Sequence, residues 1–277
     1  MYDVIVIGGG PAGLQAALTI GRMHRDVLLL DSGEYRNATV DHAHNLITND
    51  GRSPAELRRV AREELAAYPT VEVRTVTVSA ASGALGDFAV ATAAGTEHAR
   101  RMVLATGMRD ELPAVPGLAQ QWGRRVAQCP FCHGHEFAGE RVAILIEGDH
   151  GLMIERMLRP VVASALIVRP ADLAEVAEVG GGLELTYADG RVERVAGVFT
   201  AAAASQRAPF AAQLGCAHLP GGGVEVDPLG RTTVPGVYAG GDMAHVATVP
   251  GPMVSLAAAI ASGQLAGASA VRDDVME

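Results

Sequence analysis

The chain has few of the residues that mark nucleic-acid binding. No run of basic residues is long enough to form a nucleic-acid track, and the formal net charge of −9 has the wrong sign for anionic partners. Aromatic residues make up 4% of the 277 residues, while glycine occurs 33 times. This composition excludes nucleic acid as a partner and suits a fold with tight turns, as one large domain or two smaller ones.

Long apolar runs are also scarce. The most apolar late segment, residues 254–271, is mostly Ala, Gly and Ser and contains Gln264, so it favours a buried helix over a membrane span. The chain opens directly on an apolar strand at residues 2–7, without a basic leader. We therefore expect a cytoplasmic protein that has no membrane partner.

What the chain does have is a nucleotide-binding start. The apolar strand leads into the glycine-rich turn Gly8-Gly9-Gly10-Pro11-Ala12-Gly13, which fits GxGxxG, and a helix pattern over 14–23 follows. A second strand, residues 26–30, ends at Asp31. Gly8 permits the turn, Gly10 lets backbone approach a pyrophosphate, Gly13 lets the helix pack closely, and Asp31 can accept hydrogen bonds from a ribose.

Two of the three cysteines form a CxxC motif. Cys129-Pro130-Phe131-Cys132 is followed at once by His133-Gly134-His135-Glu136. Such a pair can cycle between dithiol and disulfide, and its place at a helix start favours a thiolate. A zinc half-site and a coincidental pair are the alternatives, but zinc would need two more ligands and no second CxxC exists. The third cysteine, Cys216, is expected to be a buried thiol.

A second candidate nucleotide site lacks the fingerprint. The strand at 141–146 leads into Glu147-Gly148-Asp149-His150-Gly151-Leu152, where no GxGxxG fits and two carboxylates stand where a pyrophosphate needs bare amides. The helix pattern at 152–163 contains Pro160, which would shorten it. After the next strand, 165–168, Arg169 is the only basic residue for a 2′-phosphate, and Asp172 and Glu175 lie nearby. A β-hairpin is predicted from strands at 183–187 and 191–199.

Two further segments carry a family resemblance. Met102-Val103-Leu104-Ala105-Thr106-Gly107 and Pro235-Gly236-Val237-Tyr238-Ala239-Gly240-Gly241-Asp242, together with the first fingerprint, resemble the two-dinucleotide-domain flavoproteins. The place of the CxxC after the ATG strand is similar to low-molecular-weight thioredoxin reductases, as are residues 31–37, 44–51 and 209–239. The motif CPFCHGHE most resembles that family's dithiol-oxidase branch, which closes disulfides in small dithiol natural products.

The resemblance implies an α/β fold, a two-dinucleotide-binding-domain flavoprotein. Its split FAD-binding Rossmann-like domain would cover residues 1–110 and 220–277, and a reduced inserted domain at 111–219 would carry the CxxC. The cofactor would be FAD, with NADPH binding lost or weak; an unusual loop that still binds NADPH is the alternative. The implied FAD-binding residues are Gly8, Gly10, Pro11, Ala12, Gly13, Asp31, Ser32, Arg36, Asn37, Asn45, Val76, Ala105, Thr106, Gly107, Gly241, Asp242, Met253 and Val254.

The resemblance also assigns roles around the CxxC. Cys132 would exchange electrons with the flavin, and Cys129 would form the mixed disulfide with substrate. Where thioredoxin reductases usually have Asp after the second Cys, this chain has His133, which can act as a base toward an incoming thiol. His135 and Glu136 are further candidates for catalysis, or they orient the loop. The backbone N–H groups of Met253 and Val254 would face the flavin, although Met253 can equally line a substrate pocket or pack in the core.

Three functions follow from these features. The first is a dithiol oxidase that takes electrons from a dithiol through Cys129 and Cys132 to FAD and then to O₂. The second is a thioredoxin-reductase-like disulfide reductase, fed weakly by NADPH or by another donor such as ferredoxin. The third is a non-catalytic FAD-binding protein. The partner would be a small dithiol or disulfide or a thioredoxin-like protein, and the resemblance implies a homodimer.

Overall fold

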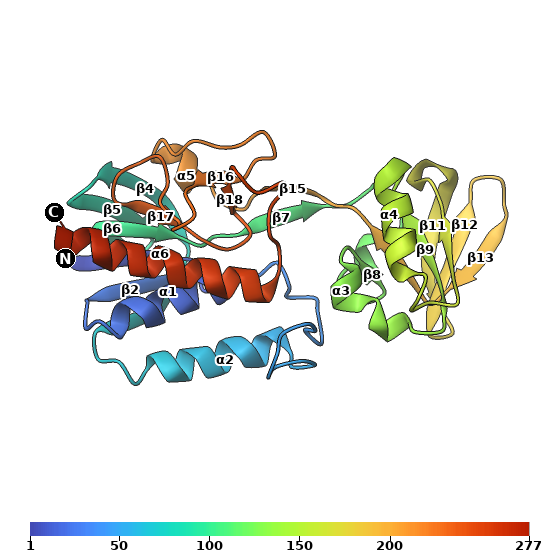
Figure 1. Cartoon of the computed structure of the whole chain (residues 1–277), viewed down its shortest axis with the longest axis horizontal. Helices are drawn as coiled ribbons and strands as arrows, with labels where there is room; N and C mark the ends of the chain where they lie inside the picture. Colours follow the sequence, from blue (N-terminus) through green and yellow to red (C-terminus); the bar gives the residue numbers. More distant parts are fainter. Residues whose placement is uncertain (277) are drawn as a thin grey trace. The chain divides into compact units, whose positions relative to one another are not determined.

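We describe a computed structural model of the chain, covering residues 1–276 (Figure 1). The contacts divide it into two compact α/β units. Unit 1 contains residues 1–36, 55–109 and 204–277, and unit 2 contains residues 37–54 and 110–203. Within residues 1–276, no helix is long and apolar enough to cross a membrane.

Unit 1 is built around a seven-stranded sheet in the order β3-β2-β1-β6-β5-β4, with β17 also paired to β6. Strands β1, β2, β3, β6 and β17 are parallel, whereas β4, β5 and β6 form an antiparallel run. Its strands are β1 (Tyr2–Ile7), β2 (Val27–Asp31), β3 (Val71–Thr75), β4 (Val78–Ala84), β5 (Asp87–Thr92), β6 (Gly95–Leu104), β16 (Val224–Val226), β17 (Val237–Ala239) and β18 (Ala244–Val246). Its helices are α1 (Pro11–Gly21), α2 (Pro54–Leu65, whose first residue belongs to unit 2), α5 (Phe210–Gln213) and α6 (Leu256–Met276).

The alternation of apolar side chains along β1 gives this sheet two buried faces. Val4 and Val6 pack with residues of α1 and α6, including Ile20 and Ala266. Ile5 and Ile7 point to the opposite face. There they join a second core that includes Phe88 of β5, Phe210 of α5 and the buried Cys216. A continuous β-branched strand between two apolar layers is thus the expected centre of a parallel sheet.

Unit 2 has a four-stranded parallel sheet in the order β10-β9-β14-β8 and a separate antiparallel sheet β11-β12-β13. Its strands are β8 (Val126–Ala127), β9 (Arg141–Leu145), β10 (Ser164–Ile167), β11 (Leu173–Val179), β12 (Gly182–Tyr187), β13 (Val192–Val195) and β14 (Gly197–Thr200). Its helices are α3 (Pro130–His133) and α4 (Gly148–Leu158), and β7 (Met108–Glu111) pairs with β15 (Ala203–Gln206) where the chain passes between the units.

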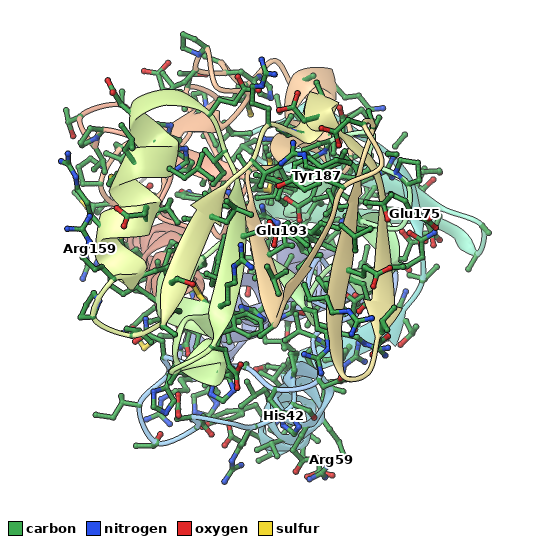
Figure 2. The ribbon with its side chains drawn as sticks, turned by 90° about the vertical axis from the view of Figure 1, so that its right-hand side faces the viewer. His42, Arg59, Arg159, Glu175, Tyr187 and Glu193 are labelled. Atoms are coloured by element: carbon green, nitrogen blue, oxygen red, sulfur yellow. A yellow bond between two sulfur atoms is a disulfide. The ribbon has the colours of Figure 1, made fainter. Side chains whose placement is uncertain are left out.

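The parallel sheet of unit 2 is covered on both faces. On one face, Ile144 of β9 and Phe199 of β14 pack with Ile154 and Leu158 of α4. On the other, Leu145 packs with the antiparallel layer. Figure 2 shows Glu175, Tyr187 and Glu193 on that layer. The buried Tyr187 side chain belongs to the hydrophobic core between the two sheets.

The predicted elements are largely confirmed, with two corrections. Helix α4 ends before Pro160 as expected, but it begins at Gly148 rather than 152. The strand predicted over 191–199 breaks at Ala196: β13 pairs in the hairpin, while β14 joins the parallel sheet. The Ala196 amide instead donates to the Arg141 carbonyl at 2.7 Å, which redirects the chain.

The domain boundaries also differ from the prediction in two places. Residues 204–219 belong to unit 1 because Phe210, Ala211 and Cys216 pack into its core. Residues 37–54, expected in the FAD-binding domain, have their contacts in unit 2. The side chains of this segment make polar contacts, such as Asp41 with Arg124 at 3.6 Å. Such contacts leave no apolar periodicity in the sequence, so the place of the segment in unit 2 could not be predicted.

Candidate active site and cofactor site

The first glycine-rich turn joins β1 to α1 with almost no space for side chains. Gly8 has φ +113°, and a Cβ there would lie 2.3 Å from the Ala105 carbonyl oxygen. A Cβ on Gly13 would lie 1.8 Å from the Gly8 carbonyl oxygen, whereas one on Gly10 would meet open space. Pro11 opens the helix, so its missing N–H costs no hydrogen bond. These residues fit a dinucleotide, because bare amides at a helix start can bind a pyrophosphate.

Asp31 ends β2 with a buried carboxylate. Its Oδ1 accepts a hydrogen bond from the Gly33 amide at 3.0 Å, and its Oδ2 accepts one from the Tyr35 hydroxyl at 2.6 Å and pairs with Arg62. Burial, followed by the hydrogen bond to Asp31, raises the pKa of Tyr35. Sequence reasoning missed Tyr35 and Arg62. Binding of a ribose by Asp31 stays a prediction, since these protein groups already satisfy the carboxylate.

The Gly-Asp corner after β17 packs against α6. Gly241 has φ +79°, and its amide donates to the Ser262 hydroxyl at 2.8 Å. Asp242 pairs with Arg36 at 2.7 Å, and both side chains are about one-fifth exposed. The structure thus brings together two of the predicted cofactor residues from distant parts of the sequence. Ser262 was missed, although the small residues of its helix indicated close packing.

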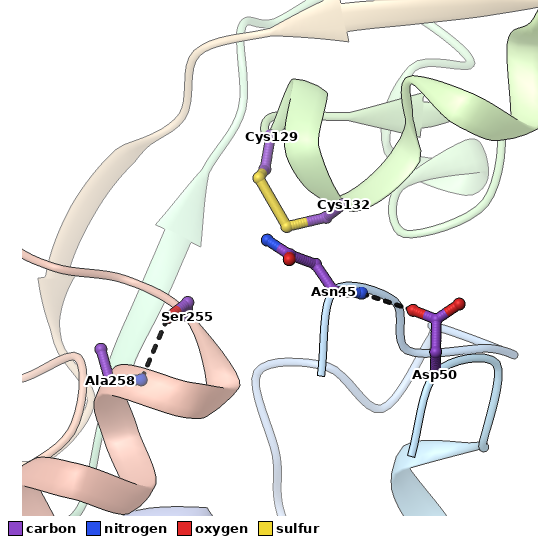
Figure 3. The surroundings of a disulfide bond; sticks show 6 residues. All are labelled: Asn45, Asp50, Cys129, Cys132, Ser255 and Ala258. Carbon is purple, nitrogen blue, oxygen red and sulfur yellow. Dashed lines mark hydrogen bonds between the residues drawn. A yellow bond between two sulfur atoms is a disulfide. The ribbon is translucent and has the colours of Figure 1, made fainter. Parts of the chain in front are cut away.

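The other predicted cofactor residues fall into three groups. In unit 1, the Thr106 amide and hydroxyl lie 3.2 and 3.3 Å from the Met243 sulfur, and the Val76 amide donates to the Asp31 carbonyl at 2.8 Å. Met253 and Val254 are exposed and precede α6, whose first turn is capped by Ser255 through the Ala258 amide at 3.1 Å (Figure 3). Asn37 and Asn45 belong to unit 2. Flavin binding by all of these residues stays a prediction; Ala12, Ser32, Ala105 and Gly107 also lie in unit 1.

The two CxxC cysteines form a disulfide at the start of α3. Their Cα atoms are 5.3 Å apart, and the amides of Cys132 and His133 both donate to the Cys129 carbonyl. Gly134 is required next, because a Cβ there would lie 2.5 Å from the Pro130 carbonyl oxygen. Phe131, between the cysteines, is 72% exposed and offers an apolar surface.

His133 is the histidine of the motif that lies inside the unit. Burial lowers its pKa below 6.5, and this outweighs the opposite effects of the Glu136 charge and a hydrogen bond with the Gly123 backbone. Its Nδ1 is buried and has no hydrogen-bond partner among the residues that the structure describes. A neutral imidazole with such a nitrogen can accept a proton. His135 is exposed, and its catalytic role stays a prediction.

Segment 37–54 lies beside the CxxC motif in unit 2. The side chain of Asn45 points toward the disulfide, and the backbone N–H of Asn45 donates to Asp50 Oδ1 at 2.7 Å (Figure 3). His44 places Nε2 3.4 Å from Glu136 Oε1 and Nδ1 3.5 Å from Asp50 Oδ2. No pattern in the sequence would join His44 to Glu136 across about 90 residues. Within residues 1–276, no group of three His, Cys, Asp or Glu side chains could hold a metal ion.

The turn between β9 and α4 has kept part of the glycine pattern. A Cβ on Gly151 would lie 2.0 Å from the Ile146 carbonyl oxygen, as Gly13 does with Gly8. Gly148 has φ +67° and faces open space, in the place of Gly10. Ile146 replaces the first glycine, and the exposed Glu147 and Asp149 flank Gly148. Arg169, the expected phosphate partner, pairs with Asp172 at 2.7 Å.

The comparisons with known proteins agree with this architecture. The family model for pyridine nucleotide-disulphide oxidoreductases matches residues 2–148 and 161–264, so the chain belongs to that family. The chain is 28% identical to "Thioredoxin reductase sirT" from Leptosphaeria maculans, over 96% of this chain and 92% of that protein. A "Probable thioredoxin reductase" from Arthroderma benhamiae is 39% identical over 52% of this chain, and the match spans only 37% of that protein. An oxidoreductase from Agrobacterium tumefaciens has a similar solved structure, with TM-score 0.90, 32% identity and 99% coverage of both chains.

This chain is therefore a thioredoxin-reductase-like oxidoreductase, and its family implies a flavin cofactor. The predicted α/β class and flavoprotein architecture are confirmed.

Proposed function

We propose that the protein is an FAD-dependent dithiol oxidase. It closes a disulfide in a small dithiol through Cys129 and Cys132, and O₂ is the final electron acceptor. The observation that carries this proposal is the turn before α4. The exposed Glu147 and Asp149 lie in the turn that corresponds to the glycine-rich turn before α1, and Arg169 is already paired with Asp172. A carboxylate close to a phosphate opposes binding, so electrons are better supplied by a dithiol than by NADPH.

The thiol chemistry follows from the disulfide and His133. The His133 imidazole accepts the proton of the first substrate thiol, and the thiolate attacks the Cys129 sulfur. The Cys129–Cys132 bond breaks, and its electron pair goes to the Cys132 sulfur. The Cys132 thiolate takes the proton of the second substrate thiol, and the resulting thiolate attacks the substrate sulfur of the mixed disulfide. The bond to Cys129 breaks, the Cys129 thiolate takes the proton held by His133, and the substrate leaves as a disulfide. Two electrons and two protons have passed from the substrate to the CxxC pair.

The first turn and the Gly-Asp corner would hold the cofactor. The amides at Gly10–Gly13 would bind the pyrophosphate, and Asp242, oriented by Arg36, would accept hydrogen bonds from the ribityl chain. Bound there, FAD would accept the two electrons of the dithiol pair and deliver them to O₂. Phe131 would offer its exposed ring to the apolar part of the dithiol.

Anaerobic stopped-flow mixing tests this proposal. The flavin of the purified protein should bleach rapidly with a small dithiol and slowly or not at all with NADPH. Cys129→Ser and Cys132→Ser should each abolish bleaching by the dithiol. Fast bleaching by NADPH without bleaching by dithiols would overturn the proposal, and unchanged function in both cysteine variants would favour a non-catalytic flavoprotein.

A thioredoxin-reductase-like disulfide reductase is the second candidate. Gly148 and Gly151 preserve two positions of the phosphate-binding turn, and relatives carry the name thioredoxin reductase. NADPH-driven or ferredoxin-driven reduction of a thioredoxin-like protein would support it. Assembly as a homodimer and a cytoplasmic location stay predictions from the resemblance; light scattering of the purified protein measures the first, and fractionation of the source cells the second.

A further inference from the structure

The loop before α2 contributes a histidine to the surroundings of the CxxC motif. The His44 ring lies between two carboxylates, with Nε2 3.4 Å from Glu136 and Nδ1 3.5 Å from Asp50. The ring is 24% exposed, and the Glu136 side chain is 34% exposed. The contact joins the loop to the turn that follows α3, so it is a feature of the tertiary structure of unit 2.

The loop is built to hold this ring in place. The amide of Ala43 donates to the Arg52 carbonyl at 2.8 Å, and the Gly51 amide donates back to Ala43 at 2.9 Å. Asp50, in turn, accepts the Asn45 amide at 2.7 Å. The closed loop therefore fixes Asp50, and Asp50 faces one nitrogen of His44 while the other is directed to Glu136.

Glu136 connects this loop to the motif histidine. It follows His133 by three residues, so both side chains extend from the same short helical stretch. The Glu136 charge raises the pKa of His133, while burial, the larger effect, and His44 lower it. His44 and Glu136 thus act on His133 in opposite directions.

We propose that His44 is a positioning residue of the dithiol site, which holds Glu136 and limits its action on His133. The proposal rests on the proposed dithiol exchange and names a residue that assists it. With His44 in place, His133 stays a neutral base that can take the proton of the incoming thiol. Without His44, the charge of Glu136 would hold the proton on His133 more strongly. His133 would then become protonated, and stop acting as a base, at a higher pH.

Other charged groups around these side chains remain unchanged in the test. The hydrogen bond from the Asn45 backbone lowers the pKa of the Asp50 carboxyl most, and the charges of His44 and His135 lower it further. Asp41 pairs with Arg124 next to Gly123, whose backbone bonds to His133. Because the variants below keep these groups, a change in the ionisation of His133 reports on His44 and Glu136.

The test compares His44→Asn, Glu136→Gln and the double variant with the wild type. The rate of anaerobic flavin reduction by a small dithiol is measured against pH. We expect the acidic limb of the rate–pH profile to move up by about 0.5 pH unit in H44N and down by a similar amount in E136Q. The shifts are small because both side chains are partly exposed and their charges are screened by solvent. The double variant should lie closer to the wild type than either single variant, because the charges of His44 and Glu136 change the pKa of His133 in opposite directions. H42N is the matched control, a histidine of the same loop whose Nδ1 contacts the Gly51 carbonyl, and it should not move the limb.

Two results would overturn the proposal. One is an unchanged acidic limb in H44N with a wild-type melting temperature. The other is an acidic limb that moves as far in the double variant as in H44N, which would show that Glu136 does not oppose His44. NMR titration of isotope-labelled histidines measures the ionisation of His133 directly in oxidised wild type and H44N. If dithiols reduce neither protein, the proposed function fails, and the NMR shift alone then decides whether His44 controls His133.

Discussion

Two strand–turn–helix segments of this chain pack in a similar way but differ in the charge of their turns. The first turn carries no charged side chain, and the second carries two carboxylates. In the first, β1 leads through Gly8–Gly13 into α1; in the second, β9 leads through Ile146–Gly151 into α4. The last glycine of each turn packs against the carbonyl of the residue five positions earlier. A Cβ on Gly13 or Gly151 would lie 1.8 or 2.0 Å from that carbonyl oxygen. The close approach of helix to strand has therefore been retained in both.

The difference lies in what the turns expose. The first presents glycine, proline and alanine, so its amides are open to a phosphate. The second presents Glu147, Asp149 and His150, all exposed. Packing glycines preserve the fold, while a few exposed charges decide whether the turn binds an anion. On the proposed function, the second strand–turn–helix segment has kept its structure but no longer binds a dinucleotide.

The largest expected effect comes from a methyl group at the packing glycines. Gly13→Ala and Gly151→Ala place Cβ atoms against a carbonyl oxygen, so each should destabilise its unit by about 1–3 kcal/mol. Only G13A should lose flavin. Thermal unfolding by circular dichroism measures the first effect, and flavin absorbance after gel filtration measures the second. An equal loss of flavin in G151A would contradict the expected difference in flavin binding between the two turns.

A restored second turn should gain affinity for NADPH. Ile146→Gly, Glu147→Gly and Asp149→Pro together reproduce the first four residues of the Gly8 turn. Removing two carboxylates should tighten NADPH binding by at least about tenfold, because one unit charge at 4 Å from another costs about 1–4 kcal/mol in water or near a protein surface. Isothermal titration calorimetry measures the gain, and I146G alone is the control with both carboxylates kept. An unchanged affinity in the triple variant would show that charge is not the barrier.

The pH dependence of unit 2 should follow His133. Its pKa is lowered below 6.5 by burial, so the native state binds fewer protons than the unfolded state at acidic pH. Stability should therefore fall as the pH drops below 6.5, and dithiol oxidation should fall as the pH drops through the lowered pKa. His133→Asn should remove both dependences. Urea titrations from pH 5 to 8 measure the first, with H150N as the exposed control; a pH-independent difference between wild type and H133N would contradict it.

The smallest effect is expected at the two arginine–carboxylate pairs. Arg36→Ala removes the partner of Asp242 in a partly buried corner. It should weaken flavin binding several-fold, as expected for a hydrogen bond to a charged group. Arg169→Ala removes an exposed pair and should change neither flavin binding nor the unfolding midpoint. Flavin fluorescence titration of the apoprotein measures the flavin affinity of both variants. Weaker flavin binding in R169A would contradict the expected difference between the two arginine pairs.

Local patterns in the sequence predicted most of the fold. The β-branched run of β1, the glycine turn and the acid at the end of β2 are each determined by neighbours a few residues away. The contacts that were missed join distant residues through polar side chains. Tyr35 and Arg62 bind Asp31, Ser262 binds the Gly241 amide, and His44 binds Glu136. Such contacts leave no periodicity, so only the tertiary structure reveals them.

The engaged carboxylate of Asp31 has a consequence for how the cofactor enters. Its partners Gly33, Tyr35 and Arg62 all come from the protein, and the carboxylate also lies against Gly9, where a Cβ would be 2.1 Å from Oδ2. The desolvation of this charge has thus been compensated during folding. The glycine turn is preorganised, so a dinucleotide bound there would lose little affinity to the ordering of the turn.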